Sequence, residues 1–259
     1  MTSTGSVPIS IVVPVRDEAE RLATFLAAHS WAAERIVVDN GSRDDSADVA
    51  ASSGARVVAS PDTTIGRARN AGADAAKSGW VLALDIDEIA EDELVDEIRN
   101  VLADPKYSAY RIRRRNFVGG REQRRGHMAR DFVTRLYRRQ LRFTSARVHE
   151  KLLVDTEVGT IRGSLRHEPY RDRAHHLEKI DRYARWGAEE LFAQGRRAGT
   201  AALLFRPAWK FFKAYVLDGH CLDGREGLEA SLIGSRGVFR KYAYLRALGK
   251  QRNADAAPP

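Results

Sequence analysis

Cysteine is nearly absent from this chain of 259 residues, which contains only Cys221. One cysteine cannot form an internal disulfide or a cysteine-based zinc cluster, so the composition suits a reducing compartment. The chain also lacks an apolar run of roughly 20 residues, the length that a membrane span needs. No basic stretch followed by an apolar stretch, as in a secretory leader, opens the sequence. We therefore expect a cytoplasmic protein, attached at most peripherally to the inner face of a membrane.

Glycine motifs that bind nucleotide phosphates are absent as well. Neither G-x-G-x-x-G nor G-x-x-x-x-G-K-[ST] follows any of the strands predicted below. This absence argues against a dinucleotide-dependent dehydrogenase and against a P-loop enzyme. The composition is otherwise that of an ordinary globular protein, with 43% hydrophobic and 30% charged residues.

Positive charge is in excess, and the excess is local. The net charge is +8, and residues 110–139 contain eleven arginines against two acids. Such a density indicates an anionic partner, for which nucleic acid, anionic lipid headgroups and a phosphorylated small molecule all qualify. The alternative interpretation is a solvated basic face without a dedicated ligand.

Apolar, β-branched runs alternate with helical segments over residues 8–102. The runs are ISIVVPV, ERIVVDN, ARVVAS and WVLALDID. Because they lack period-2 alternation and are separated by helical stretches, they predict a mostly parallel sheet that is covered on both faces. Ligands of such sheets bind at the carboxyl ends of the strands. The loops of interest are therefore 14–20, 39–46, 60–70 and 85–92.

The pattern changes in the second half of the chain. From about residue 106, the segments SAYRIRRRNFV, FVTRLYRR, LRFTSARV and KLLVD predict antiparallel strands joined to the same sheet. From about residue 171 the pattern becomes helical, with two further helices around a Gly/Asp turn at 218–224. We expect a catalytic domain over 7–170 and a helical extension over 171–250 that makes acceptor, dimer or membrane-surface contacts.

The segment RPAWKFFKAY, within that extension, combines aromatic and basic residues. It fits a membrane surface, with Trp209, Phe211, Phe212 and Tyr215 immersed and the lysines among the headgroups. Packing on the core or in a dimer is the favoured interpretation, because aromatic stripes on helices usually serve packing.

Three acids follow the fourth apolar run, in VLALDIDEIAEDEL at residues 81–94. Unpaired carboxylates are costly at the end of a buried strand. Asp85 and Asp87, at positions i and i+2 of a strand end, project in the same direction, with Glu88 behind them. Such a pair can hold Mg²⁺ or Mn²⁺ together with substrate phosphate oxygens. Alternatively, the acids cap the helix that follows.

The segments IVVPVRDEAERL, IVVDNGSRDDS and IGRARNAGADAAKSGWVLALDIDE occur in this order. Together they resemble the family 2 glycosyltransferases, nucleotide-sugar-dependent enzymes of the GT-A fold that invert anomeric configuration. The resemblance implies an α/β, Rossmann-like GT-A sheet with helices on both faces and a helical C-terminal extension. The later segments DFVTRLYRR, LRFTSARVHEKLLVD and AALLFRPAWKFFKAYVL are similar to the branch of lipopolysaccharide-core glucosyltransferases and certain peptide and antibiotic glycosyltransferases.

The resemblance implies a donor site at the ends of the first four strands. The loop from Pro14 to Glu18 would border the nucleotide, and Asp39 to Ser42 would contact uracil or ribose. Asn40 stands where the family usually has an acid, although an amide can still pair with the uracil imide. Arginines there would offer planar forks of donors to the pyrophosphate. The implied donor-site residues are Pro14, Arg16, Glu18, Asp39, Asn40, Gly41, Ser42, Arg67, Arg69, Asn70, Asp85 and Ile86.

The resemblance also implies metal ligands and a base. Asp87 would bind the Mn²⁺ or Mg²⁺ ion directly, and Asp85 would touch the ribose or a metal-bound water. Inversion needs a base for the acceptor proton, and Glu150 is the first candidate. His149 beside it would meet the metal or the pyrophosphate, unless the two form a surface pair at a strand end. Asp131 is the second candidate for the base, unless it only pairs with a neighbouring arginine.

We therefore expect a metal-dependent inverting transferase that moves a sugar, glucose by preference, from UDP to an acceptor hydroxyl, with a thiol as the alternative. The acceptor is a small molecule, glycan or peptide, and the arginines favour an anionic one; no nucleic-acid partner is expected. Nucleotidyl transfer is a second hypothesis, but it needs a Gly-rich, Lys-bearing loop that VPVRDEAERL lacks. A third is a non-catalytic nucleic-acid or lipid-binding module, whose binding would fall with salt and need no metal.

Overall fold

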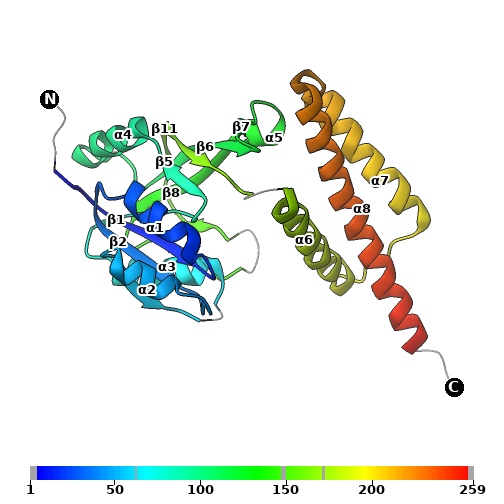
Figure 1. Cartoon of the computed structure of the whole chain (residues 1–259), viewed down its shortest axis with the longest axis horizontal. Helices are drawn as coiled ribbons and strands as arrows, with labels where there is room; N and C mark the ends of the chain where they lie inside the picture. Colours follow the sequence, from blue (N-terminus) through cyan, green and yellow to red (C-terminus); the bar gives the residue numbers. More distant parts are fainter. Residues whose placement is uncertain (1–4, 62, 147–149, 171–172, 256–259) are drawn as a thin grey trace. The chain divides into compact units, whose positions relative to one another are not determined.

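The structure is a computed structural model that describes residues 5–61, 63–146, 150–170 and 173–255. The chain forms two compact units (Figure 1). The first, here called the sheet unit, contains the residues up to Asn116 together with Asp131–Glu168. The second, the helical unit, contains Phe117–Arg130 and the residues from Pro169 onward.

The sheet unit is an α/β structure built on one large sheet, as the sequence predicts. The strand order is β3-β2-β1-β4-β8-β6-β11-β5. The first four strands in this order are parallel, β8 is antiparallel to both of its neighbours, β11 is parallel to β6, and β5 is antiparallel to β11. These strands are β1 (Val7–Val15), β2 (Ala32–Asp39), β3 (Arg56–Ala59), β4 (Trp80–Ala83), β5 (Glu88–Ala90), β6 (Ala109–Val118), β8 (Asp131–Arg138) and β11 (Gly159–His167).

Helices cover both faces of this sheet, because its central strands are apolar on both sides. Alternate residues of β1 point to opposite faces: Ile11 and Val13 join a core with α1, α2 and α4, whereas Val12 joins a core with α3. Gly72 of α3 lets that helix approach the sheet closely, since a Cβ there would lie 2.2 Å from a Val12 methyl carbon. The four helices are α1 (Ala19–Ala28), α2 (Ser46–Ser52), α3 (Ile65–Ala75) and α4 (Asp92–Ala103).

Two features of the sheet unit differ from the sequence prediction. The segments LRFTSARV and KLLVD supply β9 (Arg142–Phe143) and β10 (Leu152–Leu153), which form a separate two-stranded sheet instead of joining the main one. The long strand β11 and the short strand β5 were not predicted. Two glycines, Gly159 and Gly163, and two arginines, Arg162 and Arg166, interrupt the apolar character of β11, so the sequence pattern does not indicate a strand.

The helical unit is built around one long helix, α8 (Gly224–Asp255), against which α6 (Arg173–Ala193) and α7 (Thr200–Phe212) pack. A π-helical turn, η1 (Lys213–Leu217), and a 3₁₀ turn, η2 (His220–Asp223), connect α7 to α8. The unit also contains β7 (Arg121–Glu122), which pairs with the end of β6, and α5 (Gly126–Ala129).

The aromatic residues of α7 do not fill the core of this unit. Trp209 is 60% exposed and Phe212 is also exposed. The expectation of packing on the core is therefore wrong for Trp209 and Phe212, whereas Phe211 and Tyr215 are half-buried and stack on each other. Packing in a dimer stays a prediction. Within the described residues, none of the helices combines the length and the apolarity that a membrane crossing requires.

Candidate functional site

The loops after β1 and β2 are held together by hydrogen bonds. The Asp17 amide donates to Ser42 Oγ at 3.1 Å, and the Arg43 amide donates to Asp17 Oδ1 at 2.7 Å. Asp17 has a positive φ of 56°, which is uncommon for a residue with a side chain. Asp39 Oδ1 accepts from the Ser42 amide and hydroxyl at 2.9 and 2.6 Å. These bonds organise the two loops in advance of any ligand.

Asn40 connects the second loop to the third. Its amide nitrogen donates to the Thr63 carbonyl at 3.1 Å, and its amide oxygen accepts from the Thr63 N–H at 2.9 Å. Asn40 is also buried. Both polar atoms of its side chain therefore hold backbone in place, and the contact with uracil that the family resemblance implies stays a prediction.

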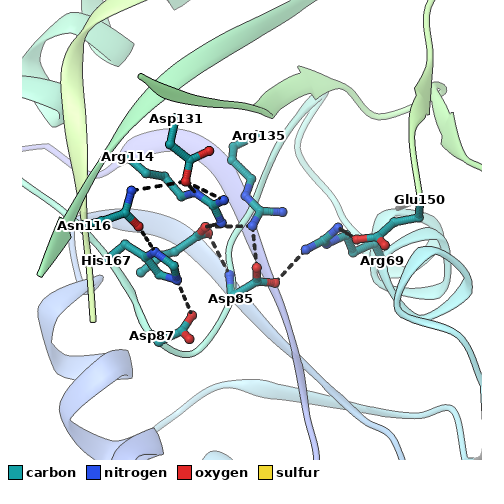
Figure 2. Close-up of polar contacts among 10 residues, drawn as sticks. Arg69, Asp85, Asp87, Arg114, Asn116, Asp131, Arg135, Glu150 and His167 are labelled. Carbon is teal, nitrogen blue, oxygen red and sulfur yellow. Dashed lines mark hydrogen bonds and ion pairs between the residues drawn. The ribbon is translucent and has the colours of Figure 1, made fainter. Parts of the chain in front are cut away.

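Arg69 of α3 links the first acid of the D-x-D triplet to the predicted base. Its Nη2 lies 2.6 Å from Asp85 Oδ1, and its Nη1 lies 2.5 Å from Glu150 Oε1 (Figure 2). Arg135 Nη2 from β8 contacts the other Asp85 oxygen. Burial favours the neutral form of Asp85, but Arg135 and Arg69 outweigh burial and hold the pKa of Asp85 well below its ordinary value. Asp85 is therefore an ionised carboxylate that two guanidinium groups hold in place.

Glu88 is fully buried beneath this pair. Its Oε1 lies 2.7 Å from Arg135 Nη2 and 3.2 Å from Arg114 Nη1. Its Oε2 accepts the Asp85 amide at 3.0 Å. Burial would lower the pKa of Arg135, yet Asp85 and Glu88 raise it above its ordinary value. Glu88 thus balances charge below the site and fixes the turn that carries the D-x-D triplet.

Asp87, the second acid of the triplet, faces a histidine from β11. His167 Nε2 lies 3.6 Å from Asp87 Oδ1, and the Glu168 amide fixes the Asp87 carbonyl at 2.9 Å. On its other side, His167 Nδ1 lies 2.5 Å from Asn116 Oδ1, and Asn116 Nδ2 donates to Asp131 Oδ2 at 3.2 Å (Figure 2). The four residues form a line of polar contacts that runs from Asp131 to Asp87.

This line fixes which ring nitrogen of His167 donates to Asn116. The Asp131 carboxylate also accepts from Arg114 at 2.7 Å and is acceptor-only when ionised, so the Asn116 NH₂ group must face it. The Asn116 oxygen then faces His167, and Nδ1 of His167 must carry the proton. Nε2 is left facing Asp87, which is the arrangement of histidines that ligate metals and donate their other N–H to an oxygen.

The residues at this position fit a divalent cation bound partly by a substrate. Asp87 offers a carboxylate and His167 an imidazole nitrogen, both acceptable ligands for Mn²⁺. Asp85 is poorly suited as a direct ligand, because arginines contact both of its oxygens. Among the residues that the structure describes, no group of three or more His, Cys, Asp or Glu side chains is arranged to hold a metal ion. A cation here would depend on other ligands, such as phosphate oxygens and water.

The other residues of the implied donor site lie in different local environments. Asn70 ties α3 to β9 through two hydrogen bonds with the Phe143 backbone, at 2.9 and 2.8 Å. Ile86 packs against the core, whereas Arg16 and Arg67 are exposed. Pro14 lies in β1, Glu18 lies at the start of α1, and Gly41 lies at a turn with a φ of 80°. His149 lies outside the described residues.

Comparison with known proteins gives the family. The family model described as Glycosyl transferase family 2 matches residues 10–167, which is more than half of the chain. The chain belongs to glycosyl transferase family 2. The matched region of this family 2 glycosyltransferase ends at His167, so it includes both residues of the candidate metal site.

Relatives of similar length carry the same general name. An uncharacterized glycosyltransferase of Rickettsia typhi is 26% identical over 96% of this chain and 90% of its own. One from Rickettsia felis is 27% identical over 96% of this chain and 93% of its own. The similarity to these relatives therefore extends beyond the sheet unit into the helical unit.

Among solved structures, this family 2 glycosyltransferase is similar to glucosyl-3-phosphoglycerate synthase from Mycobacterium tuberculosis, whose crystals contain Mn²⁺, UDP and glucosyl-3-phosphoglycerate. The identity is 26%, and the match covers 43% of this chain and 44% of that chain, with a TM-score of 0.36. This chain thus matches less than half of that protein, and a TM-score this low supports no inference about the site.

Four residues that contact the D-x-D region or one another were not selected from the sequence: Arg114, Asn116, Arg135 and His167. His167 ends β11, a strand that was not predicted, so nothing in the sequence placed it near Asp87. The two arginines lie in a run of eleven, where no pattern separates buried from exposed members. The sequence does contain one sign that a strand ends at His167. The SLR segment precedes this residue, and Glu168 and Pro169 follow it.

Proposed function

We propose that this chain is a metal-dependent, inverting glycosyltransferase that moves a sugar, with glucose as the first choice, from a UDP-sugar to an acceptor hydroxyl. The observation that supports this most is the position of Asp87 and His167, 3.6 Å apart at the carboxyl edge of the parallel strands. Loops of this edge bind ligands in open α/β sheets. Family membership makes the sugar nucleotide the natural ligand.

In this proposal Asp87 and His167 hold the cation, Mn²⁺ or Mg²⁺, against the diphosphate of the donor. When bound, the cation neutralises the negative charge that develops on the departing UDP. Asp85 keeps the loop in place through Arg69 and Arg135 and is available to the ribose or to a metal-bound water. The loops 14–18 and 39–42, already joined to each other, border the nucleoside.

Glu150 is the proposed base. It accepts the proton of the acceptor hydroxyl as the oxygen attacks the anomeric carbon. Its link to Arg69 at 2.5 Å supports this role, because Arg69 also contacts Asp85 and so ties the base to the donor site. Asp131 is better explained as the residue that orients Asn116 and, through it, His167.

For the acceptor we propose a lipopolysaccharide-core-like sugar, a natural product or a peptide, with a thiol as the alternative to a hydroxyl. The support is the resemblance of the later segments to that branch of the family. The arginine density of residues 110–139 supports an anionic acceptor.

The experiment that tests the proposed function is a survey of nucleotide sugars with the purified chain. The protein is incubated with Mn²⁺ and each donor, and release of the nucleoside diphosphate by slow hydrolysis is measured without an acceptor. We expect release from UDP-glucose that stops when the metal is chelated. Release from another nucleotide sugar only, or release that chelation leaves unchanged, would contradict the donor or the metal assignment, respectively.

A further inference from the structure

The outward face of α7 in the helical unit is apolar and exposed. Leu204 is 63% exposed, Phe205 73% and Trp209 60%, and their spacing places them on one side of the helix with Phe212. The surface continues into η1, where Val216 and Leu217 are exposed as well. Large apolar side chains gathered on one face usually mark an interaction site. We call these six residues the α7 surface.

The opposite side of α7 is already used for packing. Leu203 packs against a core that includes Tyr242 and Leu245 of α8. The Pro207 carbonyl accepts a hydrogen bond from Ser235 Oγ of α8 at 2.9 Å. With this side fixed on α8, the helix cannot roll over to bury the α7 surface within the same unit.

The charges within α7 and η1 are all positive. Residues 200–217 contain no Asp or Glu, and their three cations are Arg206, Lys210 and Lys213. Arg206 is held in place by the Tyr242 hydroxyl at 2.7 Å, and Lys213 by Asp218 at 2.9 Å. On the helix, these cations follow one edge of the apolar arc.

We propose that the α7 surface binds a bilayer surface that contains anionic lipid. Apolar side chains on one helix face, a Trp among them, and cations beside them are the features of helices that lie in the plane of a membrane interface. The 13 residues of α7 are too few to cross a bilayer, which leaves an orientation parallel to the surface. Lipid binding by this surface needs no sugar donor or acceptor and is separate from the proposed transfer.

A second copy of the chain is the competing occupant, and the charges disfavour it. A two-fold contact through the α7 surface would bring the same three cations of both copies into one interface. Residues 200–217 contain no acid, and Asp218, which follows them, is already paired with Lys213 at 2.9 Å. Anionic headgroups would instead pair with these cations.

Vesicle flotation with the full chain tests the proposal. Vesicles of phosphatidylcholine alone are compared with vesicles that also contain phosphatidylglycerol. The test variants are Leu204→Asp and Trp209→Asp, and the matched control is Leu153→Asp in the sheet unit, where Leu153 is 59% exposed. All three substitutions are at exposed sites, and circular dichroism confirms that each variant is folded.

We expect the wild type to float with phosphatidylglycerol vesicles and each α7 variant to lose about tenfold or more in partitioning. The Leu153→Asp control should bind as the wild type does, and Lys210→Gln with Lys213→Gln should weaken binding to the anionic vesicles only. Equal loss in the control, or no wild-type flotation, would overturn the proposal. So would sedimentation that shows a wild-type dimer which Leu204→Asp converts to a monomer, because the second copy would then occupy this surface.

Discussion

His167 Nε2 lies 3.6 Å from Asp87 Oδ1, although β11 and the D-x-D turn are far apart in the sequence. The contact depends on β11, whose end lies beside β5 with His167 opposite Glu88. The line of polar contacts from Asp131 through Asn116 then leaves Nε2 directed at Asp87. In the proposed function, the sheet brings the two candidate metal ligands together and Asn116 orients the histidine.

The role of Asn116 can be measured through metal affinity. Asn116→Ala removes the acceptor that holds the proton on Nδ1 of His167, so the imidazole loses its fixed tautomer and orientation. We expect the affinity for Mn²⁺ in the presence of UDP to fall about 10-fold to 100-fold. Paramagnetic resonance of free Mn²⁺ measures this directly.

The matched control for that prediction is Ser10→Ala. Ser10 is another buried polar residue of the sheet unit, and its hydroxyl donates to Glu34 Oε2 at 2.6 Å, outside the donor loops and the candidate metal site. Its loss should lower the free energy of unfolding without changing the affinity for Mn²⁺ in the presence of UDP. A similar loss of Mn²⁺ affinity in both variants would mean that Asn116 acts only through general stability.

The buried charges beneath the site predict a large effect on stability. Arg135→Met leaves Glu88 buried with one fewer cation, since Arg135 Nη2 lies 2.7 Å from Glu88 Oε1. The free energy of unfolding should fall by about 3–5 kcal/mol. Arg99→Met, which breaks the exposed pair with Asp96, should cost less than about 1 kcal/mol. Urea titrations that give equal losses for the two variants would contradict this assignment.

Glu150→Gln tests the proposed base. The amide oxygen can still accept from Arg69, so the local structure should survive while the ability to take a proton is lost. The turnover should drop about 10²-fold to 10⁴-fold, with UDP binding unchanged. Release of UDP from UDP-glucose gives the rate, and calorimetry gives the binding. A variant that keeps its full rate would exclude Glu150 as the base.

His29 predicts a pH dependence of stability. Burial lowers the pKa of His29 from 6.5 to about 4, despite the bond to the Phe25 carbonyl. The neutral ring fits its setting, because Nε2 accepts the Ala90 amide at 3.2 Å. The unfolded chain takes up a proton below pH 6.5 and the folded chain does not, so the His29 contribution is complete above pH 6.5 and is lost as the pH falls towards 4.

The expected loss from His29 is about 2–3 kcal/mol between pH 7 and pH 4. His29→Gln cannot titrate in this range and serves as the reference. Urea titrations of both proteins at several pH values give the difference. Parallel pH profiles for the wild type and the variant would show that His29 does not titrate as described.

The sequence was sufficient to predict the first half of the fold. The runs that became β1, β2 and β4 are apolar on both faces, and such strands need helices on each side. Asp85 and Asp87 could be selected from the same pattern, because carboxylates that follow a buried strand are costly unless they have partners.

The remainder of the site depends on pairings that periodicity cannot show. β11 contains two glycines, one of which, Gly163, lets α4 pack close, since a Cβ there would lie 2.4 Å from Leu94 Cα. Because β11 was not predicted, the sequence could not place His167 near Asp87. Asn40 was assigned to the nucleotide by resemblance, whereas its bonds to Thr63 follow from the approach of two loops.

The most direct test is a calorimetric titration of UDP into the wild type and into Asp87→Ala and His167→Ala, each with and without Mn²⁺. We expect Mn²⁺ to strengthen UDP binding to the wild type and either substitution to abolish this gain. UDP binding that is equally strong with and without Mn²⁺, or a Mn²⁺-dependent gain that survives in His167→Ala, would contradict this expectation.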